Sequence, residues 1–130
     1  MAIDFQIENK GHYLLVTCHG PFEGTGLLAV HEKALRQAVD EGASAILVDT
    51  TALEPHAPST WTRFSFAAAV AQLQKDAETR VHVAFVGKPP LVDPRRFGET
   101  VALNRGASAA VFECTDDAAS WIDTLPIVER

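Results

Sequence analysis

Cysteine is scarce in this sequence: its 130 residues include two, Cys18 and Cys114, and they do not form a CxxC motif. Each lies in or beside an apolar run typical of a strand, where a free thiol usually behaves as a small buried hydrophobe. We therefore expect two buried, reduced thiols rather than a disulfide, a metal site or a nucleophile. Reduced thiols are typical of the cytoplasm.

Positive charge is in the minority as well, because 11 Lys and Arg face 17 Asp and Glu, for a formal net charge of -6. No run of Lys or Arg supplies a local attraction, so nucleic acid is not an expected partner. No segment approaches the ~20 apolar residues of a membrane span, and the first ten residues carry acids instead of the apolar stretch of a signal peptide. We expect a soluble, cytoplasmic protein without stable membrane insertion.

Hydrophobic residues, at 47%, are sufficient for one compact core, so residues 1–130 are predicted to form a single domain. Apolar runs predict five strands, at 3–8, 12–19, 44–50, 80–87 and 108–112. Helical spacing and end signals predict about four helices, at 24–41, 59–77, from Asp93 to just before Gly106, and from Thr115 to Pro126. The first two strands form a hairpin, and the later alternation of strand and helix predicts parallel pairing. The predicted fold is an α/β domain with a mixed, mostly parallel sheet.

Two glycines follow predicted helices at the position where a left-handed backbone ends a helix. Gly42 follows the first helix, in which His31 and Leu35 share the helical spacing of the apolar positions. Gly106 follows the third helix directly before a strand, where any side chain would be strained. We predict a left-handed backbone at both glycines.

Three segments resemble one protein family. FGETVALNRGASAAVFECTDDAASWI (97–122) is similar to the C-terminal signature of the SpoIIAA-like proteins, bacterial domains related to STAS domains (sulfate transporter and anti-sigma factor antagonist). YLLVTCHGPF (13–22) and AILVDTTAL (45–53) resemble the second and third strands of that family, so the likeness covers nearly the whole chain. The resemblance implies a β-α superhelix with a small mixed sheet, in a binding or switching module with no shared catalytic activity and no cofactor.

The resemblance also points to one loop. In anti-sigma factor antagonists an Asp-Ser-Ser-Gly stretch after strand three carries a phosphorylatable serine that controls binding to a kinase. The matching stretch here, PSTW at 58–61, keeps two hydroxyls but has neither the acid nor the glycine. The first functional interpretation is therefore a non-enzymatic regulatory or protein-interaction switch centred on Ser59 and Thr60, in a binding loop that also holds Asp49 and His56.

Parallel strands gather the loops at their carboxyl ends along one edge of the sheet, where ligands tend to bind. The residues predicted there are His19, Asp49, Thr50, Thr51, His56, Ser59, Lys88, Asp93, Arg95 and Cys114. One interpretation is a small enzyme that uses Asp49 and His56. The favoured interpretation is structural: Asp49 accepts backbone hydrogen bonds, and Ser59 or Thr60 caps the next helix. His19, His56 and Asp49 lack metal-site spacing, so no catalytic residue and no metal are predicted.

Two segments have some features of an anion-binding site. GPFEGTG (20–26) has the glycines of a phosphate loop but lacks its Lys-Ser/Thr, so it is interpreted as a helix entry. Arg95 and Arg96 occur in the first turn of the third predicted helix, where the helix dipole favours an anion. They form a candidate anion site, and solvated arginines explain the pattern equally.

The second predicted helix carries more apolar surface than one face can bury. Its candidate interaction surface consists of Trp61, Phe64, Phe66, Val70 and Leu73. We expect this surface to bind a protein partner, most simply a second copy of the chain in a symmetric homodimer. One alternative is a carrier of a small apolar or lipid-like ligand between the second and third helices. Another is a helix tucked between the sheet and a neighbouring helix.

Overall fold

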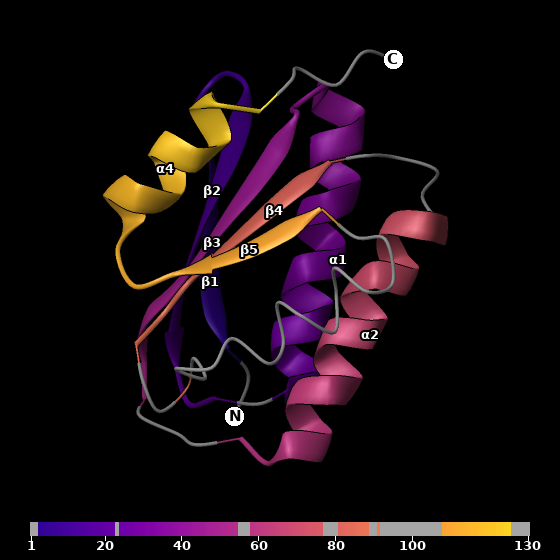
Figure 1. Cartoon of the computed structure of the whole chain (residues 1–130), viewed down its shortest axis with the longest axis vertical. Helices are drawn as coiled ribbons and strands as arrows, with labels where there is room; N and C mark the ends of the chain where they lie inside the picture. Colours follow the sequence, from indigo (N-terminus) through magenta and orange to yellow (C-terminus); the bar gives the residue numbers. More distant parts are fainter. Residues whose placement is uncertain are drawn as a thin grey trace.

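The structure is a computed structural model that describes residues 3–22, 24–54, 58–76, 81–88, 91 and 108–125. The elements in these residues are β1 (Asp4–Asn9), β2 (Tyr13–Gly20), α1 (Gly24–Glu41), β3 (Ala45–Leu53), α2 (Thr60–Asp76), β4 (His82–Val86), β5 (Ala109–Phe112) and α4 (Thr115–Asp123) (Figure 1). Each lies within about three residues of the bounds that the pattern of the sequence predicts. The helix predicted from Asp93, its arginines Arg95 and Arg96, and the left-handed Gly106 lie outside the described residues.

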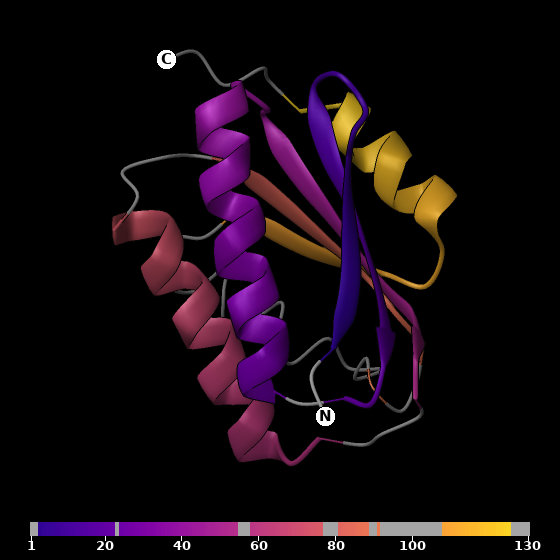
Figure 2. The same ribbon diagram turned by 180° about the vertical axis from the view of Figure 1, so that it is seen from behind.

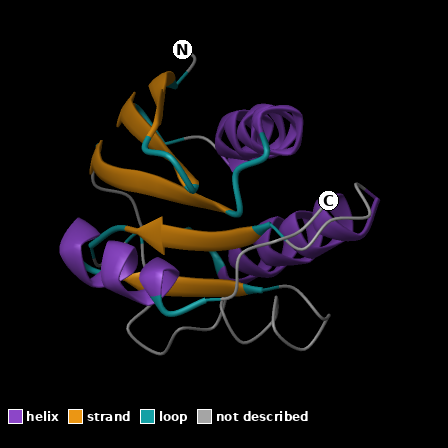
Figure 3. Ribbon diagram, turned by 90° about the horizontal axis from the view of Figure 1, so that it is seen from above, coloured by secondary structure: helices purple, strands orange, loops and turns teal. Residues whose placement is uncertain are grey.

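The strands form one sheet in the order β1-β2-β3-β4-β5. β1 and β2 pair antiparallel, whereas β2, β3, β4 and β5 are parallel neighbours. The predicted five-stranded, mixed and mostly parallel sheet is therefore confirmed. Viewed from above, the sheet lies between α4 on one side and α1 and α2 on the other (Figure 3).

Turn residues explain the β1–β2 hairpin and the end of α1. In the β1–β2 hairpin, Lys10 N–H donates to the Tyr13 carbonyl at 2.9 Å, and Gly11 has φ 103°. At the end of α1, Gly42 has φ 75°, which confirms the predicted left-handed cap. The Ala43 N–H there donates to the Ala38 carbonyl at 2.9 Å, the bond that a Schellman motif requires.

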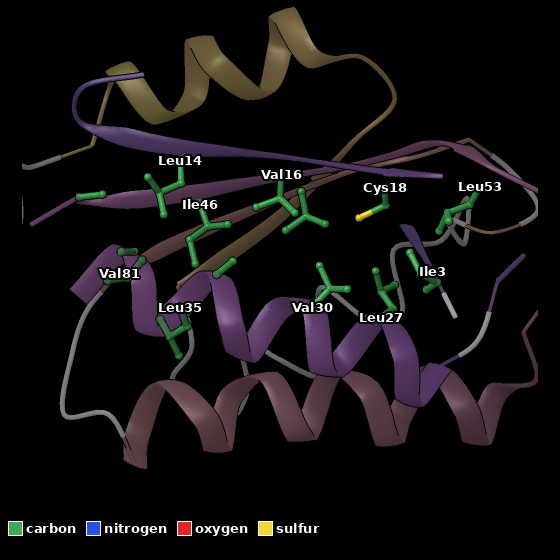
Figure 4. Close-up of a cluster of buried hydrophobic side chains, with 14 residues drawn as sticks. Ile3, Leu14, Val16, Cys18, Leu27, Val30, Leu35, Ile46, Leu53 and Val81 are labelled. Carbon is green, nitrogen blue, oxygen red and sulfur yellow. The ribbon is translucent and has the colours of Figure 1, made fainter. Parts of the chain in front are cut away.

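The core has two layers because β3 and β4 are covered on both faces. Toward α1, alternate residues of β2 and β3 contribute Leu14, Val16, Cys18 and Ile46 (Figure 4). Val48 belongs to the same layer, and all five are fully buried. Toward α4, the other residues of β3 and β4 pack against Ala118 and Ile122. Burial on both faces explains why the sequence of β3 begins as a continuous apolar run.

The two cysteines differ in exposure. Cys18 is buried, and desolvation raises the pKa of its thiol to about 11. Cys114 is exposed, so the prediction that it is buried was wrong. The reason is local: it follows the end of β5 and occupies the extended N-cap position of α4, outside both packed layers.

Candidate functional site

The amino end of α2 holds the hydroxyls that the sequence analysis singled out. Ser59 is exposed and caps the helix, because its Oγ accepts a hydrogen bond from the Thr62 N–H at 3.1 Å. The same hydroxyl donates to Thr62 Oγ1 at 3.0 Å. The Thr60 side chain and the whole of His56 lie outside what the structure describes. Ser59 therefore has a structural task at the surface, and its role as a switch stays a prediction.

An aromatic pair lies directly beside this cap. Trp61 is 73% exposed and is the exposed large hydrophobic side chain of the described residues. Its ring stacks on Phe64, with centroids 5.7 Å apart and an interplanar angle of 21°. Phe64 is half-buried and packs with Ala67, Ala71 and the sheet. The amino end of α2 therefore has an exposed apolar surface at Trp61, supported by the packed ring of Phe64.

The rest of the predicted interaction surface points into the protein, which corrects that prediction. Val70 is 1% exposed and belongs to the core, so it cannot form part of a surface. Phe66 and Leu73 are half-buried against the core layer that α1 covers. The Phe66 ring also meets Phe85 of β4 edge to face, with centroids 5.5 Å apart. What remains exposed of the predicted surface is concentrated at Trp61.

A neighbouring contact was missed by the sequence analysis. Arg63 Nη1 donates to the Leu91 carbonyl at 2.9 Å, and Arg63 Nε donates to the Pro58 carbonyl at 3.3 Å. The guanidinium thus joins the residue before the Ser59 cap to a residue beyond β4. No local pattern could reveal this contact, because Leu91 is remote from Arg63 in sequence and the acceptor is a backbone carbonyl, which every residue has.

Asp49 lies at a register change in β3. Thr17 pairs with Asp49 but His19 pairs with Ala52, so β3 has one extra residue here. Asp49 Oδ1 accepts hydrogen bonds from the Thr51 N–H at 2.9 Å and from Thr51 Oγ1 at 2.7 Å. Its backbone donor therefore lies within β3 rather than in the following loop. These bonds hold the irregular strand end in place.

Replacing Asp49 with alanine should lower the free energy of unfolding by about 1 to 2 kcal/mol, because two hydrogen bonds at the strand irregularity are lost. Urea unfolding followed by circular dichroism measures this change. Thr51→Val is the matched control, because it removes the hydroxyl bond and keeps the backbone bond, and it should lower stability by less. An Asp49→Ala variant as stable as the wild type would contradict the structural role.

Of the other predicted strand-end residues, Thr51 contacts Asp49, and His56, Asp93 and Arg95 lie outside the described residues. His19 Nε2 lies 3.8 Å from Asp4 Oδ2 on β1. Within the described ranges, no group of three or more His, Cys, Asp or Glu side chains could hold a metal ion. Because His56 is not described, the enzyme interpretation stays untested. The carrier interpretation also stays untested, since it requires the third predicted helix.

His31 is a buried ionisable side chain that shares the helical spacing of the apolar positions of α1. It lies on α1 with 0% exposure, and its ring centroid is 5.7 Å from that of Phe85. Neither ring nitrogen has a hydrogen-bond partner in the described part of the chain. Desolvation lowers the pKa of His31 to about 4, so the imidazole is neutral near pH 7.

Helices long and apolar enough to cross a membrane do not occur among the described residues. No protein-family model matches the sequence, and a comparison with curated proteins finds no match. Solved structures do match. An anti-sigma factor antagonist from Mycobacterium paratuberculosis is 17% identical with a TM-score of 0.61, and the match covers 94% of this chain and 95% of that one.

Two further structures agree with this likeness. An uncharacterised protein of the DUF3478 family from Shewanella loihica, with a SpoIIAA-like fold, is 19% identical with a TM-score of 0.53, covering 92% of this chain and 93% of that one. The anti-sigma factor antagonist SpoIIAA in its unphosphorylated form is 10% identical with a TM-score of 0.50, covering 93% and 98%. At these identities the likeness is one of fold, which confirms the fold that the three sequence segments implied. This chain has the SpoIIAA-like α/β fold.

Proposed function

We propose that the chain is a regulatory protein-interaction module, and that a different protein docks on the amino end of α2. The observation that carries the proposal is the 73% exposure of Trp61 on a supporting Phe64 ring. Tryptophan is enriched at the energetic centres of interfaces, where a rigid ring covers a large area at a small entropic cost. Two of the similar structures are of anti-sigma factor antagonists, which adds support for a role in protein binding.

Ser59 is the proposed switch of this surface. Its exposed hydroxyl is two residues before Trp61 in sequence, and it occupies the N-cap of the same helix. A phosphate there would be accommodated by the helix, because the free N–H groups and the dipole of the amino end favour negative charge. The same charge would oppose an apolar interface beside it, because docking would have to desolvate the charge. Phosphorylation would therefore leave the fold intact and weaken docking.

Photo-crosslinking tests both parts of the proposal. A photoreactive phenylalanine analogue at position 61, expressed in the protein's own cells, should give a discrete adduct with another protein. The control places the analogue at Gln72, an exposed position of the same helix, and should give no such adduct. Adding Ser59→Asp should reduce the adduct at position 61 several-fold with no loss of stability, because aspartate is itself a good N-cap.

Two results would contradict the proposal. Equal crosslinking at positions 61 and 72 would mean that the aromatic pair is not a docking surface. An adduct at position 61 that Ser59→Asp leaves unchanged would retain the docking surface and refute the switch.

A further inference from the structure

β1 is an edge of the sheet, and no described strand pairs with its outer side. α1 packs against β2 and β3, and in Figure 2 the indigo β1–β2 hairpin lies in front at the side of the sheet away from β5. Proteins usually protect an exposed edge with a proline, a bulge, an inward-pointing charge or charged side chains. β1 contains no proline, its register with β2 is continuous, and the charges along it and at Lys10 have both signs. The edge can therefore pair with another strand whose charges are complementary.

The hairpin fixes which backbone groups face outward. Lys10 N–H donates to the Tyr13 carbonyl, and the register continues from there without interruption. Hydrogen-bonded and non-hydrogen-bonded pairs alternate along an antiparallel ladder, so every second residue before Lys10 points its backbone groups toward β2. The residues in between, Phe5, Ile7 and Asn9, point their N–H and C=O groups to the outer edge.

The side chains of β1 divide into a charged and an apolar face. Asp4, Gln6 and Glu8 are exposed, on the face of the sheet that carries α4. Phe5 and Ile7 are half-buried on the opposite face, where they pack against the core layer of α1. A strand added at this edge therefore meets charged side chains on one face and the half-buried Phe5 and Ile7 on the other.

We propose that a second copy of the chain pairs with this edge, β1 against β1 in antiparallel orientation, with Ile7 opposite the partner's Ile7. This register satisfies the outward groups of both strands with about six backbone hydrogen bonds. On the charged face Asp4 lies opposite the partner's Lys10, and Gln6 opposite the partner's Glu8, while Lys10 also forms an ion pair with Glu8 of its own strand. On the apolar face Phe5 lies opposite the partner's Asn9. The two-fold axis repeats each pair, and opposite charges across a ladder attract.

Charge complementarity selects this register over its neighbours. A shift of two residues in one direction places Asp4 opposite the partner's Glu8 at both ends of the ladder. The same shift in the other direction places Glu8 opposite the partner's Glu8. A shift of one residue places apolar side chains on the charged face. Among these neighbouring alignments of DFQIENK with itself, the one with Ile7 opposite Ile7 therefore pairs opposite charges.

Charge reversal and rescue test the pairing. In sedimentation velocity at fixed salt, the wild type should dimerise reversibly in the micromolar range, as small interfaces do. Lys10→Glu and Asp4→Lys should each raise the dimer Kd by about tenfold or more, because each replaces two attractive pairs with two repulsive ones. An equimolar mixture of the two variants should dimerise like the wild type, because the mixed pair places opposite charges together at both ends. Lys75→Glu on α2 is the control for Lys10→Glu, because it changes the net charge by the same amount, and it should leave the Kd unchanged.

Three results would overturn the proposal: a wild type that stays monomeric at high micromolar concentration, a Lys10→Glu variant that dimerises like Lys75→Glu, or a mixture that does not regain dimerisation. Circular dichroism of each variant confirms that the hairpin remains folded. The proposal does not rest on the function proposed for α2, because it involves a different element and a different partner.

Discussion

Replacing His31 with leucine should make the protein more stable, and the gain should grow as the pH falls. His31 is fully buried on α1, and neither of its ring nitrogens has a hydrogen-bond partner in the described structure. An unsatisfied buried polar group typically costs about 1 to 3 kcal/mol. Leucine removes the polar atoms and keeps most of the side-chain volume beside Phe85. We therefore expect a gain of about 1 to 2 kcal/mol at pH 7, after a partial loss from imperfect packing.

The pH dependence follows from linkage. Burial lowers the folded-state pKa of His31 from 6.5 to about 4, so between these values the unfolded chain binds more protons than the folded one. The wild type therefore loses stability as the pH falls from about 6.5 toward 4. A difference of this size corresponds to about 3 kcal/mol when the full window has been crossed. His31→Leu lacks this loss, so its advantage should rise by about 2 kcal/mol between pH 7 and pH 5.

Urea unfolding of the wild type and His31→Leu at several pH values measures the effect directly. His19→Gln is the matched control, because it removes a histidine whose side chain is 50% exposed. It should not reproduce the widening difference. A constant difference between His31→Leu and the wild type across pH 5 to 7 would show that the imidazole is not held neutral by burial.

The course of α2 shows where sequence reasoning succeeds and where it fails. The spacing of its apolar residues predicted two stripes, one that includes Phe64 and one that includes Phe66 and Leu73, and its start was evident from the hydroxyls at residues 59–60. Spacing cannot say what each stripe contacts, because that depends on which neighbours the fold supplies. In the structure Phe66 and Leu73 pack with the layer under α1, while Phe64 and Ala67 pack on the sheet. The sheet and α1 therefore cover most of the apolar surface of α2, as expected for a helix tucked between the sheet and another helix, and Trp61 at the amino end stays exposed.

Local signals predicted the parts of the site that depend on adjacent residues. The N-cap role of Ser59 involves a partner three residues away, and the bonds of Asp49 involve a partner two residues away. Contacts to distant backbone groups were not predictable in the same way. Arg63 donates to the Leu91 carbonyl, and no property of either residue in the sequence indicates that they meet.

Gln74 also makes long-range contacts, and its replacement should lower the free energy of unfolding more than the other polar substitutions proposed for this protein. The side chain is 6% exposed on α2. Its Nε2 donates to the Val81 carbonyl at 2.8 Å, and its Oε1 accepts from the Ser108 N–H at 3.2 Å. One amide thus fixes the helix to the residues that directly precede β4 and β5. The two bonds also determine the orientation of the amide, since one atom must donate and the other must accept.

Gln74→Glu should lower the free energy of unfolding at pH 7 by about 3 kcal/mol or more, because it places a buried carboxylate against the Val81 carbonyl without a donor between them. Burial raises the pKa of a carboxyl group above its value of about 4.3 in the unfolded chain, so the folded state binds the extra proton. Once protonated, the carboxyl group can donate to Val81 and accept from Ser108, as the amide does. The deficit relative to the wild type at the same pH should therefore shrink as the pH falls from 7 to 5.

Gln74→Leu separates the lost hydrogen bonds from the added charge, because it removes both bonds and introduces no ionisable group. Its deficit should be about 2 kcal/mol and should stay constant relative to the wild type over the same pH range. Urea midpoints of the three proteins at pH 7 and pH 5 provide the comparison. If Gln74→Glu and Gln74→Leu have equal deficits at both pH values, the carboxylate must be reaching water, and Gln74 cannot be the buried link between α2 and the sheet.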